Sequence, residues 1–131
     1  MGARILIIED NSANMELMRY LLHAFSHQVR CATDGRQGLV QARCELPDLI
    51  ICDIHLPKLD GFGVVRKLKD DPGTHGVPVL AVTAQAMVGD RDKLLAAGFD
   101  GYICKPIEPE IFVSQVDAFL SREQRGSRIH S

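Results

Sequence analysis

Short runs of consecutive apolar residues alternate along the chain with segments whose apolar residues recur every three to four positions. Each run is too short for a helix and is bounded by charged residues, Gly or Pro, which indicates a strand. Unbroken apolar character is typical of strands covered on both faces, as in a parallel sheet between helices. The runs span Ile5–Ile8, Leu49–Cys52, Val79–Val82 and Tyr102–Cys104. A fifth candidate, Gln28–Ala32, alternates polar and apolar residues and suits an edge strand.

The segments between these strands have the spacing of amphipathic helices. In the first, Asn11 or Ser12 is the expected N-cap. Its apolar positions are Met15, Met18, Leu22 and Phe25. The second helix begins after residues 34–35 and stops near Leu46, because Pro47 disfavours helical geometry in the residue before it.

Three further helices complete the pattern. The third ends in the turn-rich residues 71–73, and the fourth runs from about Ala84 to Ala97, with Gly98 as its C-terminal stop. The fifth has Pro109 near its first turn, and its apolar face consists of Phe112, Val116, Phe119 and Leu120. A strand followed by a helix, five times over, predicts an α/β domain with a doubly wound five-stranded parallel sheet.

Length and charge narrow the range of functions. The 131 residues suit one domain, and a net charge of −2 gives no basic excess for binding nucleic acid. No apolar run approaches the roughly 20 residues of a membrane helix, and no signal peptide opens the chain, so we expect a cytoplasmic protein. The cysteines lack a CxxC pairing and are expected to be small core residues; they are Cys31, Cys44, Cys52 and Cys104.

Polar residues follow the ends of the predicted strands. Glu9 and Asp10 follow the first, Asp53 the third, Thr83 the fourth and Lys105 the fifth. Parallel α/β sheets bind ligands outside the carboxyl ends of their strands, so these side chains are expected on one rim. Any one of them could be only a helix cap or a solvated residue, but three adjacent carboxylates repel one another unless a cation neutralises them. Mg²⁺ is the simplest such cation, and the lysine supplies charge for a phosphate.

Five short motifs stand in a fixed order along the chain. They are Ile7-Ile8-Glu9-Asp10-Asn11, residues 47–57 (PDLIICDIHLP), Asp60-Gly61, Val82-Thr83-Ala84 and residues 101–106 (GYICKP). In order and spacing they resemble the receiver domain of two-component response regulators. The resemblance covers about residues 4–121 and implies a flavodoxin-like strand order, 2-1-3-4-5, with five helices. We therefore expect a receiver domain over residues 1–121 and a flexible tail over residues 122–131.

The resemblance also implies how a phosphoryl group is received. Asp53 resembles the phosphoacceptor, which takes the group from a sensor histidine kinase or a histidine phosphotransfer protein. The implied Mg²⁺ ligands are Glu9, Asp10, Asp53 and the backbone carbonyl of His55. Ligation by the His55 side chain is not expected, because Mg²⁺ prefers oxygen.

The remaining motifs imply a switch. Thr83 and Lys105 resemble the residues that bind phosphoryl oxygens, and the Lys105-Pro106 bond is expected to be cis. Tyr102 resembles the aromatic that moves inward when the threonine is drawn toward phosphate, and a half-buried edge-strand tyrosine is an equal alternative. The implied target-binding face consists of the last two helices and the strand between them. Two positions that vary in the family and tune the lifetime of the phosphate correspond to His55 and Gln85.

Three other functions would each need a different set of residues. A phosphohydrolase with an aspartyl-phosphate intermediate commonly carries a second Asp two residues after the nucleophile, where this chain has His55. An FMN carrier would need a phosphate-cradling loop in place of Glu9-Asp10. A degenerate receiver would lack one of the key residues, and none is missing. We expect a single-domain response regulator, with excision from a hybrid histidine kinase or multidomain regulator as the alternative.

Overall fold

The computed structural model describes residues 2–84, 90–121 and 124. Five parallel strands form one sheet in the order β2-β1-β3-β4-β5, as predicted. The strands are β1 (Arg4–Ile8), β2 (Gln28–Ala32), β3 (Leu49–Asp53), β4 (Val79–Thr83) and β5 (Gly101–Cys104). The helices are α1 (Ser12–Ala24), α2 (Gly35–Glu45), α3 (Gly61–Asp70), α4 (Asp90–Ala97) and α5 (Pro109–Asp117).

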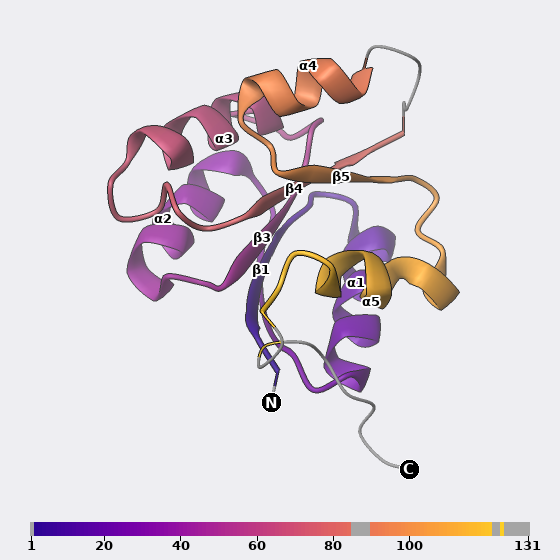
Figure 1. The fold of residues 1–131 in the computed structure, drawn as a ribbon. Coiled ribbons are helices and arrows are strands. Elements are labelled where there is room, and N and C mark those ends of the chain that lie inside the picture. Colours follow the sequence, from indigo (N-terminus) through magenta and orange to yellow (C-terminus); the bar gives the residue numbers. More distant parts are fainter. Residues whose placement is uncertain (1, 85–89, 122–123, 125–131) are drawn as a thin grey trace.

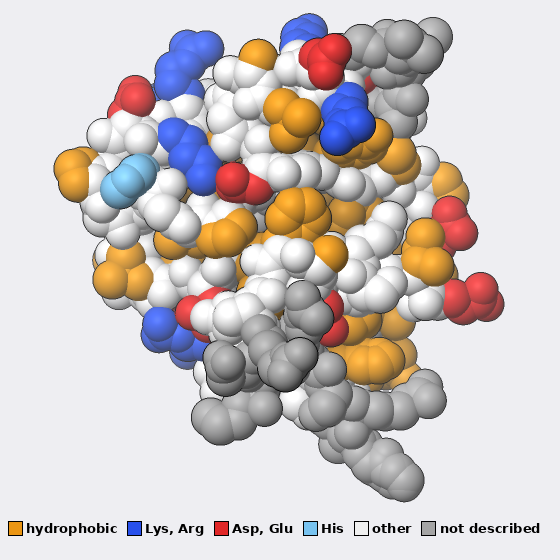
Figure 2. Space-filling view, in the orientation of Figure 1, with side chains coloured by type: hydrophobic (Ala, Val, Ile, Leu, Met, Phe, Trp, Pro, Cys, Tyr) orange, Lys and Arg blue, Asp and Glu red, His pale blue; other side chains and the backbone are white. Residues whose placement is uncertain are grey.

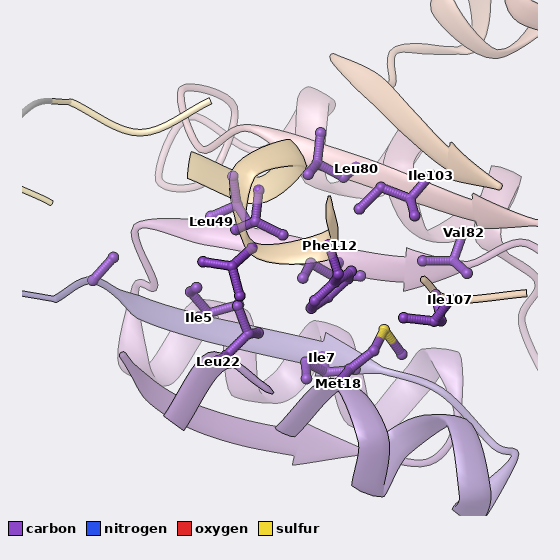
Figure 3. Packing of buried hydrophobic residues seen from close by; sticks show 14 of the residues in the cluster. Ile5, Ile7, Met18, Leu22, Leu49, Leu80, Val82, Ile103, Ile107 and Phe112 are labelled. Atoms are coloured by element: carbon purple, nitrogen blue, oxygen red, sulfur yellow. The ribbon is translucent and has the colours of Figure 1, made fainter. Parts of the chain in front are cut away.

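Helices cover both faces of the sheet. In Figure 1, α1 and α5 lie on one face, and α2, α3 and α4 lie on the other. Because successive strand residues point to opposite faces, Ile5 and Ile7 pack beneath α1 and α5 (Figure 3), whereas Leu6 and Ile8 pack beneath the other three helices. The unbroken apolar runs of the sequence therefore arise from burial on both faces, as predicted.

Short polar side chains fix where the helices begin. Oδ1 of Asn11 accepts a hydrogen bond from the Asn14 backbone N–H at 2.9 Å, so Asn11 is the N-cap of α1. Asp34 caps α2 and Asp60 caps α3 in the same way. The predicted end of α2 is confirmed, because Leu46 leaves the helix in the left-handed region with a φ of 46°.

Two helix predictions need correction. Ala84 is not helical, and α4 is described only from Asp90, because residues 85–89 lie outside the described part of the chain. Helix α5 ends at Asp117, so Leu120 and Phe119 lie beyond it rather than on its apolar face; Leu120 is buried, whereas Phe119 is 37% exposed. Its ring lies against Gly101, where an added Cβ would be 2.4 Å from the Phe119 Cζ.

The cysteine prediction was right for only part of the set. All four cysteines are free; Cys52 is buried in β3 and Cys31 is half-buried, but Cys44 and Cys104 are exposed. Cys44 lies on the solvent side of α2, and Cys104 ends β5, which is an edge strand. Apolar neighbours in the sequence thus did not predict whether a cysteine lies on the buried or the exposed face of its helix or strand.

The surface and the chain end add little to the functional picture. Charged side chains of both signs are interspersed with hydrophobic ones on the face shown in Figure 2. None of the described helices has the length and apolar content needed to cross a bilayer. The predicted tail, residues 122–131, lies outside the described residues except for Gln124.

Candidate functional site

The carboxyl ends of the strands hold the site residues on one rim of the sheet. Asp53 and Thr83 are the last residues of β3 and β4, while Glu9 and Lys105 directly follow β1 and β5. Backbone hydrogen bonds continue past the strand ends. The Glu9 N–H donates to the Ala32 carbonyl at 3.0 Å, and the Lys105 N–H donates to the Thr83 carbonyl at 2.8 Å. The sheet itself therefore positions the side chains that extend from this rim.

Three carboxylates meet at the rim. Glu9, Asp10 and Asp53 each offer an oxygen, and these oxygens all lie within 4.8 Å of one another. Glu9 and Asp53 are only 1% and 3% exposed, whereas Asp10 is open to solvent. Like charges this close repel one another unless a cation shares the site.

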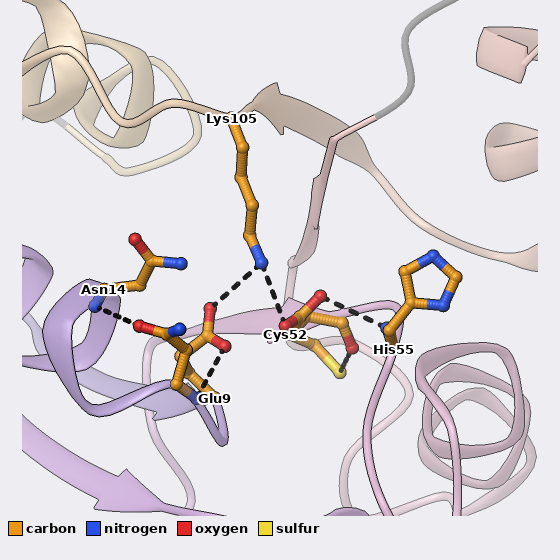
Figure 4. Close-up of polar contacts among 7 residues, drawn as sticks. Glu9, Asn14, Cys52, His55 and Lys105 are labelled. Carbon is orange, nitrogen blue, oxygen red and sulfur yellow. Dashed lines mark hydrogen bonds and ion pairs between the residues drawn. The ribbon is translucent and has the colours of Figure 1, made fainter.

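A lysine reaches this cluster from the neighbouring strand. In Figure 4 the side chain of Lys105 extends from the end of β5 toward the carboxylates. Its Nζ lies 3.1 Å from Oδ2 of Asp53 and 3.7 Å from Oε1 of Glu9. The Lys105-Pro106 peptide bond is cis, as predicted. The single ammonium group of Lys105 thus forms ion pairs with two buried carboxylates.

The two oxygens of Glu9 have different surroundings. Oε2 accepts a hydrogen bond from the Asn11 backbone N–H at 3.1 Å. Oε1 is the one buried side-chain nitrogen or oxygen in the described structure that has no hydrogen-bond partner. Burial, followed by the effect of the neighbouring Asp53, raises the pKa of Glu9 to about 7.

This arrangement suits a hard divalent cation. Buried oxygens normally accept hydrogen bonds, and a carboxylate oxygen that accepts none, beside two further carboxylates, is a ready ligand for such a cation. Mg²⁺ takes oxygen ligands and is commonly held by only one or two carboxylates, which leaves room for phosphate oxygens. The three residues therefore fit the expected metal, and Lys105 supplies only part of the charge they need.

His55 contributes through its backbone. Its N–H donates to Oδ1 of Asp53 at 3.2 Å, which orients the carboxylate. The side chain is exposed, and in Figure 4 Cys52 lies between it and Glu9. The imidazole is not part of the described carboxylate group.

Thr83 lies buried beside a small cleft that opens between the site and α4. The cleft has a volume of about 130 Å³, and its lining includes Thr83, His55, Phe62 and Lys93. The Lys93 Nζ lies 5.6 Å from the centre of the Phe62 ring, a contact that the spacing of these residues in the sequence did not indicate. Gln85, the other position expected to tune phosphate lifetime, lies outside the described residues.

Tyr102 lies on the edge strand, as predicted. It is half-buried on the edge strand β5 and packs against the hydrophobic cluster beneath α2, α3 and α4. Both the switch interpretation and the simple edge-strand interpretation fit this placement.

Comparison with known proteins gives a consistent family match. Residues 5–117 match the family model described as the response regulator receiver domain. The polar-differentiation response regulator DivK of Brucella anthropi is 39% identical over 120 residues, which cover 92% of this chain and 98% of DivK. Response regulator PleD of Caulobacter vibrioides is 38% identical, and the match covers 98% of this chain but only 31% of PleD.

A solved structure adds a neighbour with a metal. The receiver domain of a sensor histidine kinase from Pseudomonas aeruginosa is 31% identical and superposes with a TM-score of 0.82, covering 91% of this chain and 98% of that domain. That domain is described with a magnesium ion coordinated in its active-site cleft.

Proposed function

The chain belongs to the response regulator receiver domain family, and on this premise we propose that residues 1–121 receive a phosphoryl group on Asp53. The donor is a sensor histidine kinase or a histidine phosphotransfer protein. The observation that carries the proposal is the setting of the Asp53 carboxylate: it is buried, oriented by the His55 N–H and paired with Lys105 at 3.1 Å.

The reaction needs one nucleophile and well-placed charge. A carboxylate oxygen of Asp53 attacks the phosphorus, an O–P bond forms, and the N–P bond of the phosphohistidine breaks, leaving a neutral imidazole once the ring nitrogen has regained a proton. A protein promotes phosphoryl transfer mainly by positioning the reacting groups and by stabilising the negative charge on the equatorial oxygens of the transferred phosphoryl group. In this proposal the Lys105 ammonium pairs with one of these oxygens, and the Thr83 hydroxyl donates a hydrogen bond to another.

A metal site completes the proposed centre. Glu9, Asp10, Asp53 and the backbone carbonyl of His55 would hold Mg²⁺, which when bound neutralises carboxylates and phosphoryl oxygens together. The magnesium described for the Pseudomonas aeruginosa receiver domain supports this proposal. The pKa of Glu9 is raised by burial and by the neighbouring Asp53. A bound cation would offset both effects, so Glu9 would then ionise.

Output is proposed to leave through α4, β5 and α5. Thr83 would be drawn toward the phosphoryl group, and Tyr102 would move in response, altering the affinity of this face for a downstream protein. Apolar side chains are already exposed there, on α4, on α5 and just after α5; they are Leu95, Ile111 and Phe119. The four free cysteines fit a reducing compartment, and we place the exchange in the cytoplasm.

Labelling by a small phosphodonor tests the proposal. With acetyl phosphate and Mg²⁺, the wild-type chain should acquire a hydroxylamine-sensitive phosphate, and Asp53→Asn should acquire none. This substitution keeps the shape of the side chain and removes the nucleophile. Equal labelling of the two proteins would show that another residue is the acceptor.

A further inference from the structure

A groove with an apolar floor and a cationic rim runs between α2 and α3. It has a volume of about 340 Å³ and is lined by Arg36, Leu39, Val40, Arg43, Leu59 and Lys67. None of these residues belongs to the carboxylate rim or to α4, β5 and α5. The groove is therefore a surface that the proposed phosphoryl chemistry and output do not use.

The floor of the groove is apolar and accessible. Val40 is 58% exposed, and among the large hydrophobic residues that the structure describes only Tyr20 is more exposed. Leu59 is half-buried on the loop between β3 and α3. Gly63 faces Leu59, where a Cβ would lie 2.6 Å from the leucine Cδ1, so the glycine lets this side chain lie flat against α3. Together Leu39, Val40 and Leu59 present a surface for aliphatic side chains.

The charged residues that line the groove are all cationic. Nε of Arg43 pairs with Oδ2 of Asp71 at 3.1 Å, but within the described part of the chain neither Arg36 nor Lys67 makes an ion pair. This local positive charge differs from the rest of the protein: the chain as a whole has a net charge of −2, and the face in Figure 2 carries side chains of both signs. Two unpaired cations on opposite walls of an apolar groove favour a ligand that carries carboxylates on either side of aliphatic groups.

We propose that this groove docks an acidic amphipathic segment of a partner protein. One or two aliphatic side chains of the segment cover Val40 and Leu59, while flanking Asp or Glu residues reach Arg36 on one wall and Lys67 on the other. The apolar floor disfavours a nucleic acid backbone, which would gain nothing from it. Docking here does not require phosphate on Asp53.

A displayed peptide library, selected against the intact chain, supplies the probes. The selected peptides should be enriched in Asp and Glu on both sides of Leu, Ile, Val or Phe. A synthetic copy of the leading peptide should shift the backbone amide resonances of residues 36–43, 59 and 67. The same peptide should bind Asp53→Asn as tightly as it binds the wild-type chain, which separates this test from the phosphoacceptor test.

Neighbouring residues of α3 provide a matched control. Lys67→Glu should weaken peptide binding about tenfold or more, whereas Arg66→Glu changes the net charge equally outside the groove and should alter affinity by less than about twofold. Val40→Gln, at an exposed helical position, should also weaken binding several-fold. Equal effects of Lys67→Glu and Arg66→Glu, a selection without acidic enrichment, or self-association that Lys67→Glu abolishes would each overturn the proposal.

Discussion

The buried carboxyl of Glu9 should make the stability of the metal-free protein depend on pH in an unusual direction. Its pKa is about 7 in the folded chain and 4.5 in its ordinary state. Between these values the folded protein keeps a proton that the unfolded chain has released, so the free energy of unfolding decreases as the pH rises. Stability is greatest below about pH 4.5 for this group and is lost up to about pH 7.

The size of this effect follows from the shift. Each pKa unit corresponds to about 1.4 kcal/mol, so the interval from 4.5 to about 7 amounts to about 3 kcal/mol. Glu9→Gln replaces the carboxyl with a neutral amide of the same shape. The variant should match the wild type at about pH 4, below both pKa values, and be more stable by about 3 kcal/mol at pH 8.

Urea denaturation with EDTA present, repeated from about pH 4 to pH 8, measures the difference in free energy of unfolding between the two proteins. Groups distant from Glu9 contribute equally to both proteins and cancel. At pH 8, added Mg²⁺ should stabilise the wild type more than Glu9→Gln, because only the wild type offers the third carboxylate. A difference between wild type and variant that stays constant with pH would refute the reasoning.

Three further outcomes are expected. EDTA should abolish labelling by acetyl phosphate and Mg²⁺ should restore it, because three carboxylates within 4.8 Å need a cation before an anionic donor can approach; labelling that survives EDTA would remove the metal from the mechanism. Thr83→Ala should still accept phosphate on Asp53 but should lose most of the phosphorylation-dependent change in partner affinity, as measured by titration calorimetry; an unchanged response would eliminate the proposed switch. His27→Ala should cost about 2 kcal/mol in urea denaturation, because buried His27 accepts from the Ala3 N–H at 2.9 Å and contacts Asp117 Oδ1 at 3.1 Å; a loss below about 0.5 kcal/mol would contradict this role.

The order of the strands' apolar runs made both the sheet and the clustering of the acidic residues predictable from the sequence, for the same physical reason. Strands covered on both faces read as unbroken apolar runs, so their ends could be placed closely, and with them Asp53 at the end of β3 and Glu9 directly after β1. Helix ends without such a signal were less certain, and α5 stops at Asp117, short of Phe119. The lack of a hydrogen bond to Oε1 of Glu9 depends on how side chains pack, which a one-dimensional pattern does not record.

The groove between α2 and α3 was also beyond sequence reasoning. Arg36 and Lys67 are 31 positions apart in the sequence, and each alone reads as an ordinary solvated cation. Only the packing of the two helices brings both of them to the edges of one groove.

Locating the phosphate by chemical trapping tests the central claim most directly. The intact chain is phosphorylated with acetyl phosphate and Mg²⁺, reduced with borohydride, which converts an acyl phosphate to an alcohol, and analysed by peptide mass spectrometry. The account predicts homoserine in place of Asp53, with Glu9 and Asp10 unmodified. Reduction at Glu9 or Asp10, or a stable phosphate on a hydroxyl or imidazole side chain with Asp53 unchanged, would contradict it.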